Sequence, residues 1–134
     1  MNKEILLDTN ILLYIYDGID IFNEIINVLD YKPLFVIHKA SLNELNTMLN
    51  GKSTKMRNKA RVALEYLSRF KQLWIEKDDF MTYPPDDAIL LTCKKYDYIL
   101  LTNDEELKQK AKRLGVRVAS INEKGKIIRL VFTI

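Results

Sequence analysis

Four acidic positions in this sequence lie where a short apolar run gives way to a helix-like pattern. Asp8 follows the apolar run 4–7, and Asp104 follows the run 98–102. Glu44 falls in the first turn of a helical pattern after the run 33–38, and the pair Asp86–Asp87 opens another such pattern after 72–76. Open parallel sheets place their ligands outside the carboxyl ends of the strands. If these runs are parallel strands, the acids meet at one edge of the sheet.

Carboxylates that converge at one edge repel one another unless protons or a cation intervene. Oxygen ligands of this kind suit Mg²⁺ or Mn²⁺, which activate water and neutralise charge on a phosphate. Zinc is disfavoured, because the chain has a single histidine, His38, and a single cysteine, Cys93. We interpret His38 as a structural group at a strand end and Cys93 as a core residue.

Helix capping is the alternative role for each of these acids. Ser41 and Glu44 have the spacing of a capping box, and Asn103 is placed to cap the helix that Asp104 begins. Acids in a first turn also interact favourably with the helix dipole, by about 0.3–1 kcal/mol each. Capping explains any one acid as well as a catalytic site does. Acids at every junction are much less expected from capping alone.

The elements that must position these acids alternate between strand-like and helix-like patterns. Apolar runs predict strands at 4–7, 33–38, 72–76, 98–102 and 116–121, and a turn with a final alternating strand at 124–132. Apolar residues at helical spacing predict helices at 20–30, 39–51, 53–70, 84–97 and 103–115. This alternation is typical of an α/β fold in which helices cover both faces of a mainly parallel sheet.

The composition is that of one globular domain over residues 1–134, with 48% hydrophobic and 29% charged residues. A single cysteine excludes an internal disulfide framework. The sequence has no signal peptide and no run of about 18 apolar residues, so we expect a cytoplasmic protein that does not enter the membrane. The net charge of +3 permits a nucleic-acid partner without requiring one. No glycine-rich loop follows the first strand, which excludes a P-loop or dinucleotide-binding enzyme.

Four segments resemble, in order, the successive motifs of PIN-domain ribonucleases: "LLDTNILL", "SLNELNTML", "DDAILLTCKKYDYILLTNDEEL" and "LGVRVASI". The resemblance runs from about residue 4 to residue 121, nearly the whole chain. It implies a three-layer α/β/α sandwich and the hydrolysis of RNA with Mg²⁺ or Mn²⁺ at a carboxylate cluster.

Carried over by motif, the resemblance implies the site residues. Asn10 would be the polar neighbour of the first acid, and Thr102 would line the site. The third acid would be Asp87, because the family's acid stands directly before a small residue, here Ala88. The adjacent Asp86 stays open as the alternative ligand, because helical spacing alone does not choose between the two. The implied metal-binding and catalytic residues are Asp8, Glu44, Asp87 and Asp104.

The resemblance leaves more than one biological role open. A toxin of the VapC type would pair with a small antitoxin protein, and other PIN nucleases trim ribosomal RNA precursors. A catalytically inactive, RNA-binding relative is the non-enzyme alternative. A homodimer is also implied, and the apolar helical segments 21–29 and 56–70 are the candidates for its interface.

A basic segment supplies the candidate RNA-binding surface. Between positions 52 and 71 cations greatly outnumber the single acid, Glu65. A solvated helix face is an equally good interpretation of this pattern, and a second basic group at 108–113 is offset by neighbouring acids. The predicted phosphate-binding residues are Lys52, Lys55, Arg57, Lys59 and Arg61.

Overall fold

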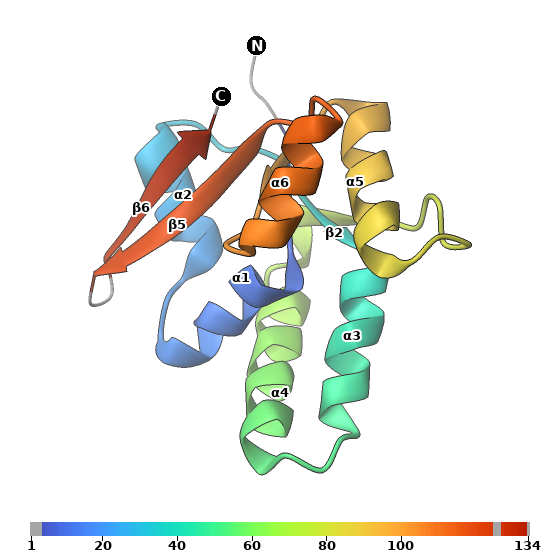
Figure 1. Cartoon of the computed structure of the whole chain (residues 1–134). Helices are drawn as coiled ribbons and strands as arrows, with labels where there is room; N and C mark the ends of the chain where they lie inside the picture. Colours follow the sequence, from blue (N-terminus) through green and yellow to red (C-terminus); the bar gives the residue numbers. More distant parts are fainter. Residues whose placement is uncertain (1–3, 125–126, 134) are drawn as a thin grey trace.

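A twisted sheet forms the centre of the molecule (Figure 1). The computed structural model describes residues 4–124 and 127–133. The strands of this part of the chain are β1 (Ile5–Leu7), β2 (Phe35–His38), β3 (Trp74–Lys77), β4 (Ile99–Leu101), β5 (Val118–Lys124) and β6 (Ile127–Thr133). Their order is β3-β2-β1-β4-β5-β6, and every pair is parallel except β5 with β6. The predicted mainly parallel sheet is confirmed.

Helices cover both faces of this sheet. They are α1 (Thr9–Leu13), α2 (Ile21–Leu29), α3 (Lys39–Leu49), α4 (Thr54–Arg69), α5 (Pro85–Tyr96) and α6 (Glu105–Arg113), with short 3-10 turns at Tyr14–Asp17 and Lys71–Leu73. Buried residues of α1, α2, α3 and α4 share one core, and those of α5 and α6 share another. The predicted three-layer α/β/α architecture is therefore confirmed.

The two cores follow from the alternation of side chains along the strands. Ile5 and Leu7 of β1 enter the larger core, whereas Leu6 between them enters the core beneath α5 and α6. The side chains of β4 alternate in the same way, and Leu100 enters the core beneath α5 and α6. Cys93 of α5 is buried in that second core, which confirms its interpretation as a packing residue.

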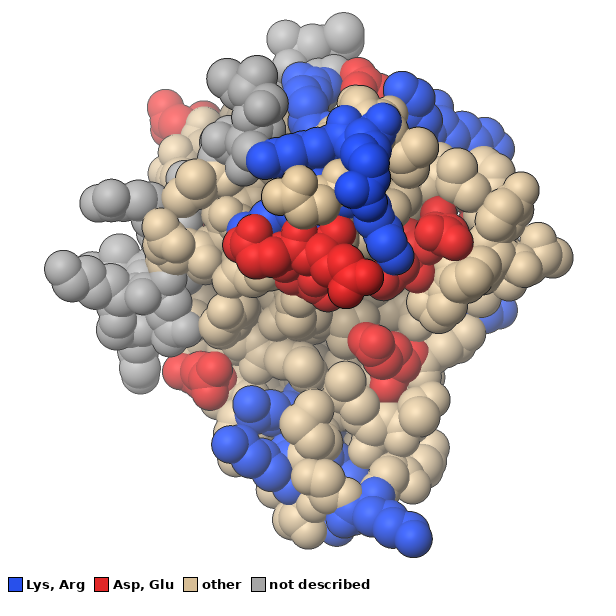
Figure 2. Space-filling model, viewed as in Figure 1, with Lys and Arg blue, Asp and Glu red and all other residues tan. Residues whose placement is uncertain are grey.

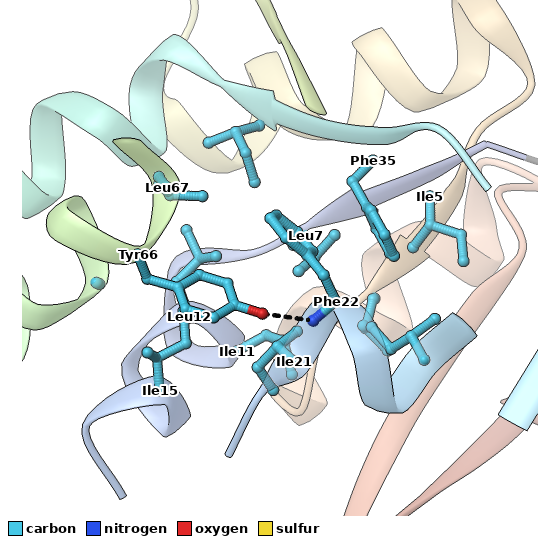
Figure 3. Close-up of a cluster of buried hydrophobic side chains, with 14 of the residues drawn as sticks. Ile5, Leu7, Ile11, Leu12, Ile15, Ile21, Phe22, Phe35, Tyr66 and Leu67 are labelled. Atoms are coloured by element: carbon cyan, nitrogen blue, oxygen red, sulfur yellow. Dashed lines mark hydrogen bonds between the residues drawn. The ribbon is translucent and has the colours of Figure 1, made fainter. Parts of the chain in front are cut away.

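One tyrosine hydroxyl joins two helices of the larger core (Figure 3). The hydroxyl of Tyr66 in α4 accepts a hydrogen bond of 2.9 Å from the backbone N–H of Phe22 in α2, and it donates one to the carboxylate of Asp20. Phe22 in turn stacks on Phe35 of β2, with 4.4 Å between ring centroids. Tyr66 therefore supplies a partner for an amide at the start of α2, where the Asp20 side chain makes no capping bond.

Several expectations change in detail. β2 begins at Phe35 rather than at Pro33, since proline has no N–H to give to a strand ladder. The turn expected near 125–126 lies outside the described residues.

The apolar faces of α2 and α4, proposed for a dimer interface, are buried within the chain's own core. In the described part of the chain, no helix is long and apolar enough to cross a membrane.

Candidate active site

The parallel strands bring the N-terminal ends of several helices to one edge of the sheet. β2, β1 and β4 are neighbours, and at its carboxyl end each leads within a few residues into α3, α1 and α6 respectively. The N-terminal end of α5 lies at the same edge (Figure 1). Figure 2 shows acidic side chains gathered at the middle of this face, near the starts of α5 and α6. The strand order therefore places the acidic junctions of the sequence side by side.

Asp8 is the innermost acid of this edge and is only 8% exposed. One of its carboxylate oxygens accepts a hydrogen bond of 2.8 Å from the backbone N–H of Thr9, and the other accepts one of 2.8 Å from the hydroxyl of Thr102. Burial raises the pKa of Asp8 despite these two bonds, and the charges of Asp86 and Glu44 raise it further. The structure thus brings three predicted acidic positions into electrostatic contact.

Thr102 links Asp8 to the last acid of the set. Its fully buried hydroxyl donates to Asp8 and accepts a hydrogen bond of 3.1 Å from the backbone N–H of Asp104. Asp104 is the N-cap of α6, because its Oδ1 accepts from the N–H groups of Glu106 and Leu107 at 2.9 and 3.1 Å. One carboxylate oxygen of Asp104 thus serves the helix. The carboxylate of Asp104 therefore caps a helix and also lies at the predicted acidic site.

Asn103 does not cap α6, contrary to the expectation from sequence. Its side-chain oxygen accepts from the N–H of Ile121 at 2.8 Å, and its amide nitrogen donates to the carbonyl of Ile121 at 3.0 Å and to the hydroxyl of Tyr14 at 2.9 Å. The side chain thus extends the pairing of β4 with β5 beyond the end of β4. No local pattern indicates this role, because the two residues are 18 positions apart. The contact fixes the segment from which Asp104 projects.

Asp86 and Asp87 occupy the first turn of α5. Partial burial raises the pKa of Asp86, the nearby ammonium of Lys110 opposes that shift, and repulsion from Asp104 and Asp87 adds to it. The charge of Asp86 also acts on Asp8. Asp86 therefore interacts electrostatically with both Asp8 and Asp104. Lys110 was missed as a neighbour of the site, because sequence spacing assigns it only to the basic end of α6.

α3 begins earlier than the capping-box interpretation requires. His38 is the N-cap, since its Nδ1 accepts from the N–H of Ala40 at 3.0 Å while its Nε2 donates to the carbonyl of Asp79 at 2.8 Å. This confirms that His38 is structural. Ser41 and Glu44 both lie inside the helix, so the predicted capping box is wrong. The side chain of Glu44 is exposed, and its charge acts on Asp8.

A family model described as "PIN like domain" matches residues 5–124 of this chain. The chain belongs to the PIN-like domain family. Ribonuclease VapC9 of Archaeoglobus fulgidus is 31% identical to this PIN-like domain over 122 residues, which are 90% of this chain and 84% of that protein. The resemblance seen in the sequence motifs is thereby confirmed.

Solved structures agree with this PIN-like fold. The PIN domain endonuclease Utp24 superimposes with a TM-score of 0.75 at 22% identity, over 98% of this chain and 92% of that chain. A domain of a functionally unknown protein from Methanocaldococcus jannaschii superimposes with a TM-score of 0.65 at 20% identity, over 98% of this chain and 99% of that one. At these identities the likeness shows a shared fold.

The donors at the acidic edge of this PIN-like domain have the chemistry that Mg²⁺ and Mn²⁺ prefer. They are carboxylates, and the buried side-chain oxygen of Asn10, near Asp8, has no hydrogen-bond partner. Within residues 4–124 and 127–133, no three acidic, histidine or cysteine side chains stand close enough to hold an ion as they are. Carboxylate oxygens and an unpaired amide oxygen are nevertheless ligands of the kind that a hard divalent ion prefers, so the residue types fit such an ion.

Basic residues flank the acidic patch on two sides. Figure 2 shows one basic group above it, over α6, and another below it, at the far end of the α3–α4 pair. The lower group contains the predicted RNA-binding residues, of which Lys52, Lys55 and Arg61 are exposed. Arg57 instead holds the turn before α4, because it donates to the carbonyl of Gly51 at 2.8 Å and to the hydroxyl of Thr54 at 3.0 Å.

Proposed function

We propose that this PIN-like domain is a divalent-metal-dependent endoribonuclease that hydrolyses RNA phosphodiester bonds. The observation that carries the proposal is that the strand order places the junctions with Asp8, Glu44, Asp86 and Asp104 at one edge of the sheet, where charges of these acids act on one another. Its family and its relative Ribonuclease VapC9 support the choice of RNA as the substrate. Asp87, the acid that the family motif indicates, lies next to Asp86 in the first turn of α5, and the two are alternative ligands of the proposed site.

Each residue of the site would have a different role in such a reaction. The chemistry that Mg²⁺ or Mn²⁺ supplies at carboxylates is the activation of water and the neutralisation of charge on the phosphate. Asp8 provides a charged oxygen in a fixed direction, because Thr9 and Thr102 hold both of its carboxylate oxygens. Asp104 is held in place by its capping bonds, and the ammonium of Lys110 offers a cation for a phosphate beside the acids.

We further propose that the protein is the toxin of a toxin–antitoxin pair, with a small antitoxin as its partner. Identity to Ribonuclease VapC9 across most of both chains supports this role over ribosomal RNA processing. Co-expression with the product of the adjacent gene, followed by purification, tests it. A stable complex that suppresses RNA cleavage is the expected result, and full cleavage in the presence of every neighbouring gene product contradicts it.

Purified protein should cleave single-stranded RNA when Mg²⁺ or Mn²⁺ is added and should lose that activity when the metal is chelated. The reason is that the carboxylates alone offer no positive charge to the phosphate. The measurement is the appearance of RNA fragments on a gel, with protein from a mock purification as the control. RNA binding without any cleavage in either metal would identify an inactive RNA-binding domain instead.

The basic end of the α3–α4 pair should bind the RNA backbone. α3 has 11 residues and rises about 1.5 Å per residue, so this end lies about 16 Å from the start of the helix. Changing Lys52, Lys55 and Lys59 together to glutamine should flatten the log–log dependence of RNA affinity on salt by about two units, since each single-strand phosphate contact contributes about 0.7. Arg57 is left unchanged, because it holds the turn.

A matched variant controls for the loss of net charge. Lys32, Lys71 and Lys94 are exposed and lie toward the amino edge of the sheet, away from the acids. Changing these three to glutamine should leave the salt dependence close to that of the wild type. Equal effects of the two triple variants would show that the α3–α4 end contributes only general charge.

A further inference from the structure

Two buried side-chain oxygens in the described part of the chain have no hydrogen-bond partner: Oδ1 of Asn10 and Oγ of Ser41. Ser41 is only 1% exposed. A buried polar group without a partner costs about 1–3 kcal/mol, so such groups are uncommon in folded proteins and call for an explanation. By contrast, the buried hydroxyl of Thr92 donates to the carbonyl of Ala88 at 2.7 Å, and that of Thr102 donates to Asp8 at 2.8 Å.

Both unpaired oxygens lie at the acidic edge of the sheet. Asn10 is the second residue of α1 and stands two positions after Asp8. Ser41 is in the first turn of α3, three positions before Glu44, so these two side chains share one face of the helix. α1 and α3 follow neighbouring parallel strands and contact each other. Because the charge of Glu44 acts on Asp8, the two oxygens flank a connected acidic site.

Among the described residues, no hydrogen bond accounts for the hydroxyl of Ser41. The sequence suggests a capping box with Glu44, but His38 is the N-cap of α3 and already serves the N–H of Ala40. Ser41 lies one position beyond that amide, inside the helix. A nonpolar residue of similar size would fill the same space without the cost of an unpaired hydroxyl. We therefore expect a ligand to complete the hydrogen bonding of this hydroxyl.

We propose that Ser41 and Asn10 hydrogen-bond the waters of a hydrated divalent cation held at Asp8 and Glu44. This inference rests on the proposed metal-dependent function and adds two positioning residues to it. Mg²⁺ keeps several of its waters when carboxylates bind it, and those waters donate hydrogen bonds. The carbonyl oxygen of Asn10 and the hydroxyl of Ser41 are acceptors of the required kind. Each orients the cation through its waters instead of touching the ion.

The test measures stability and metal binding separately. Without metal, Ser41→Ala should melt at the same temperature as the wild type or higher, since the change removes an unpaired hydroxyl and adds a better helix former. With metal, the same variant should bind Mg²⁺ or Mn²⁺ about tenfold more weakly by calorimetry, in line with the losses of about 10–100-fold seen when groups outside the ligand shell are removed. Asn10→Ala should weaken metal binding similarly.

Thr92→Val is the matched control, because it removes a buried hydroxyl that does have a hydrogen-bond partner, the carbonyl of Ala88 in the same helix. It should lower the melting temperature without metal and leave metal affinity unchanged. Wild-type metal affinity in Ser41→Ala would overturn this inference while leaving the proposed function intact. A wild-type protein that binds neither Mg²⁺ nor Mn²⁺ would overturn both proposals together.

Discussion

Replacing Asp8 by asparagine should lower the rate of RNA cleavage by about a thousandfold, which corresponds to about 4 kcal/mol of lost transition-state stabilisation. The change keeps the shape of the side chain and an oxygen that can accept from the N–H of Thr9. It removes the negative charge of the most buried acid of the cluster, on which the charges of Asp86 and Glu44 act. The measurement is single-turnover cleavage of RNA at saturating Mg²⁺. Glu65→Gln on the exposed side of α4 controls for a general change of charge and should keep full activity.

The same Asp8 variant should be at least as stable as the wild type when no metal is present. The folded-state pKa of Asp8 is raised by burial, so ionising this carboxyl costs stability as the pH rises above its unfolded value of about 4. Asparagine removes that cost at neutral pH. The free energy of unfolding in urea, compared at pH 4 and pH 7, should therefore fall less with rising pH in the variant. Wild-type cleavage together with a strong loss of stability would assign Asp8 to capping alone.

Asp86→Asn should reduce RNA cleavage far more than Asp87→Asn, by about a hundredfold against a few-fold. The physical reason is position, since Asp86 acts electrostatically on Asp8 and is itself acted on by Asp104. A ligand carboxylate provides charge stabilisation of about 3 kcal/mol, whereas a first-turn acid provides only about 0.3–1 kcal/mol through the helix dipole. The two variants carry the same change of charge in adjacent residues, so each is the control of the other.

Metal affinity provides a second measurement of the same comparison. Asp86→Asn should weaken the binding of Mn²⁺ by calorimetry, and Asp87→Asn should leave it near the wild-type value. The reverse order would show that the motif, in which the acid precedes Ala88, identifies the ligand better than the electrostatic interactions of Asp86 do. In that case α5 would have to rotate its first turn when the cation binds.

Local patterns in the sequence determined most of the fold. The apolar runs at the strands and the helical spacing between them predicted every strand and nearly every helix, because each element buries its own apolar face. The alternation of strands and helices predicted the parallel sheet, because a helix between two strands lets both strands run in the same direction. The exceptions are the short helix α1 and the 3-10 turn that follows it. This segment ends at Gly18, whose φ is +88°, and a turn that depends on one residue leaves no repeating pattern in the sequence. The acidic residues at the strand ends also predicted the proposed site at this edge of the sheet and a divalent cation as its ligand.

Only the tertiary structure decided how those acids are arranged and what surrounds them. Strand order puts β1 between β2 and β4, and this brings Glu44 and Asp86 within reach of Asp8, although nothing in the sequence states that order. The position of Lys110 near Asp86 depends on how α5 and α6 pack against each other and against the sheet. The hydrogen bonds of Asn103 and the unpaired hydroxyl of Ser41 depend on groups distant in sequence. Local periodicity carries no information about such contacts, because they form only when separate elements pack together.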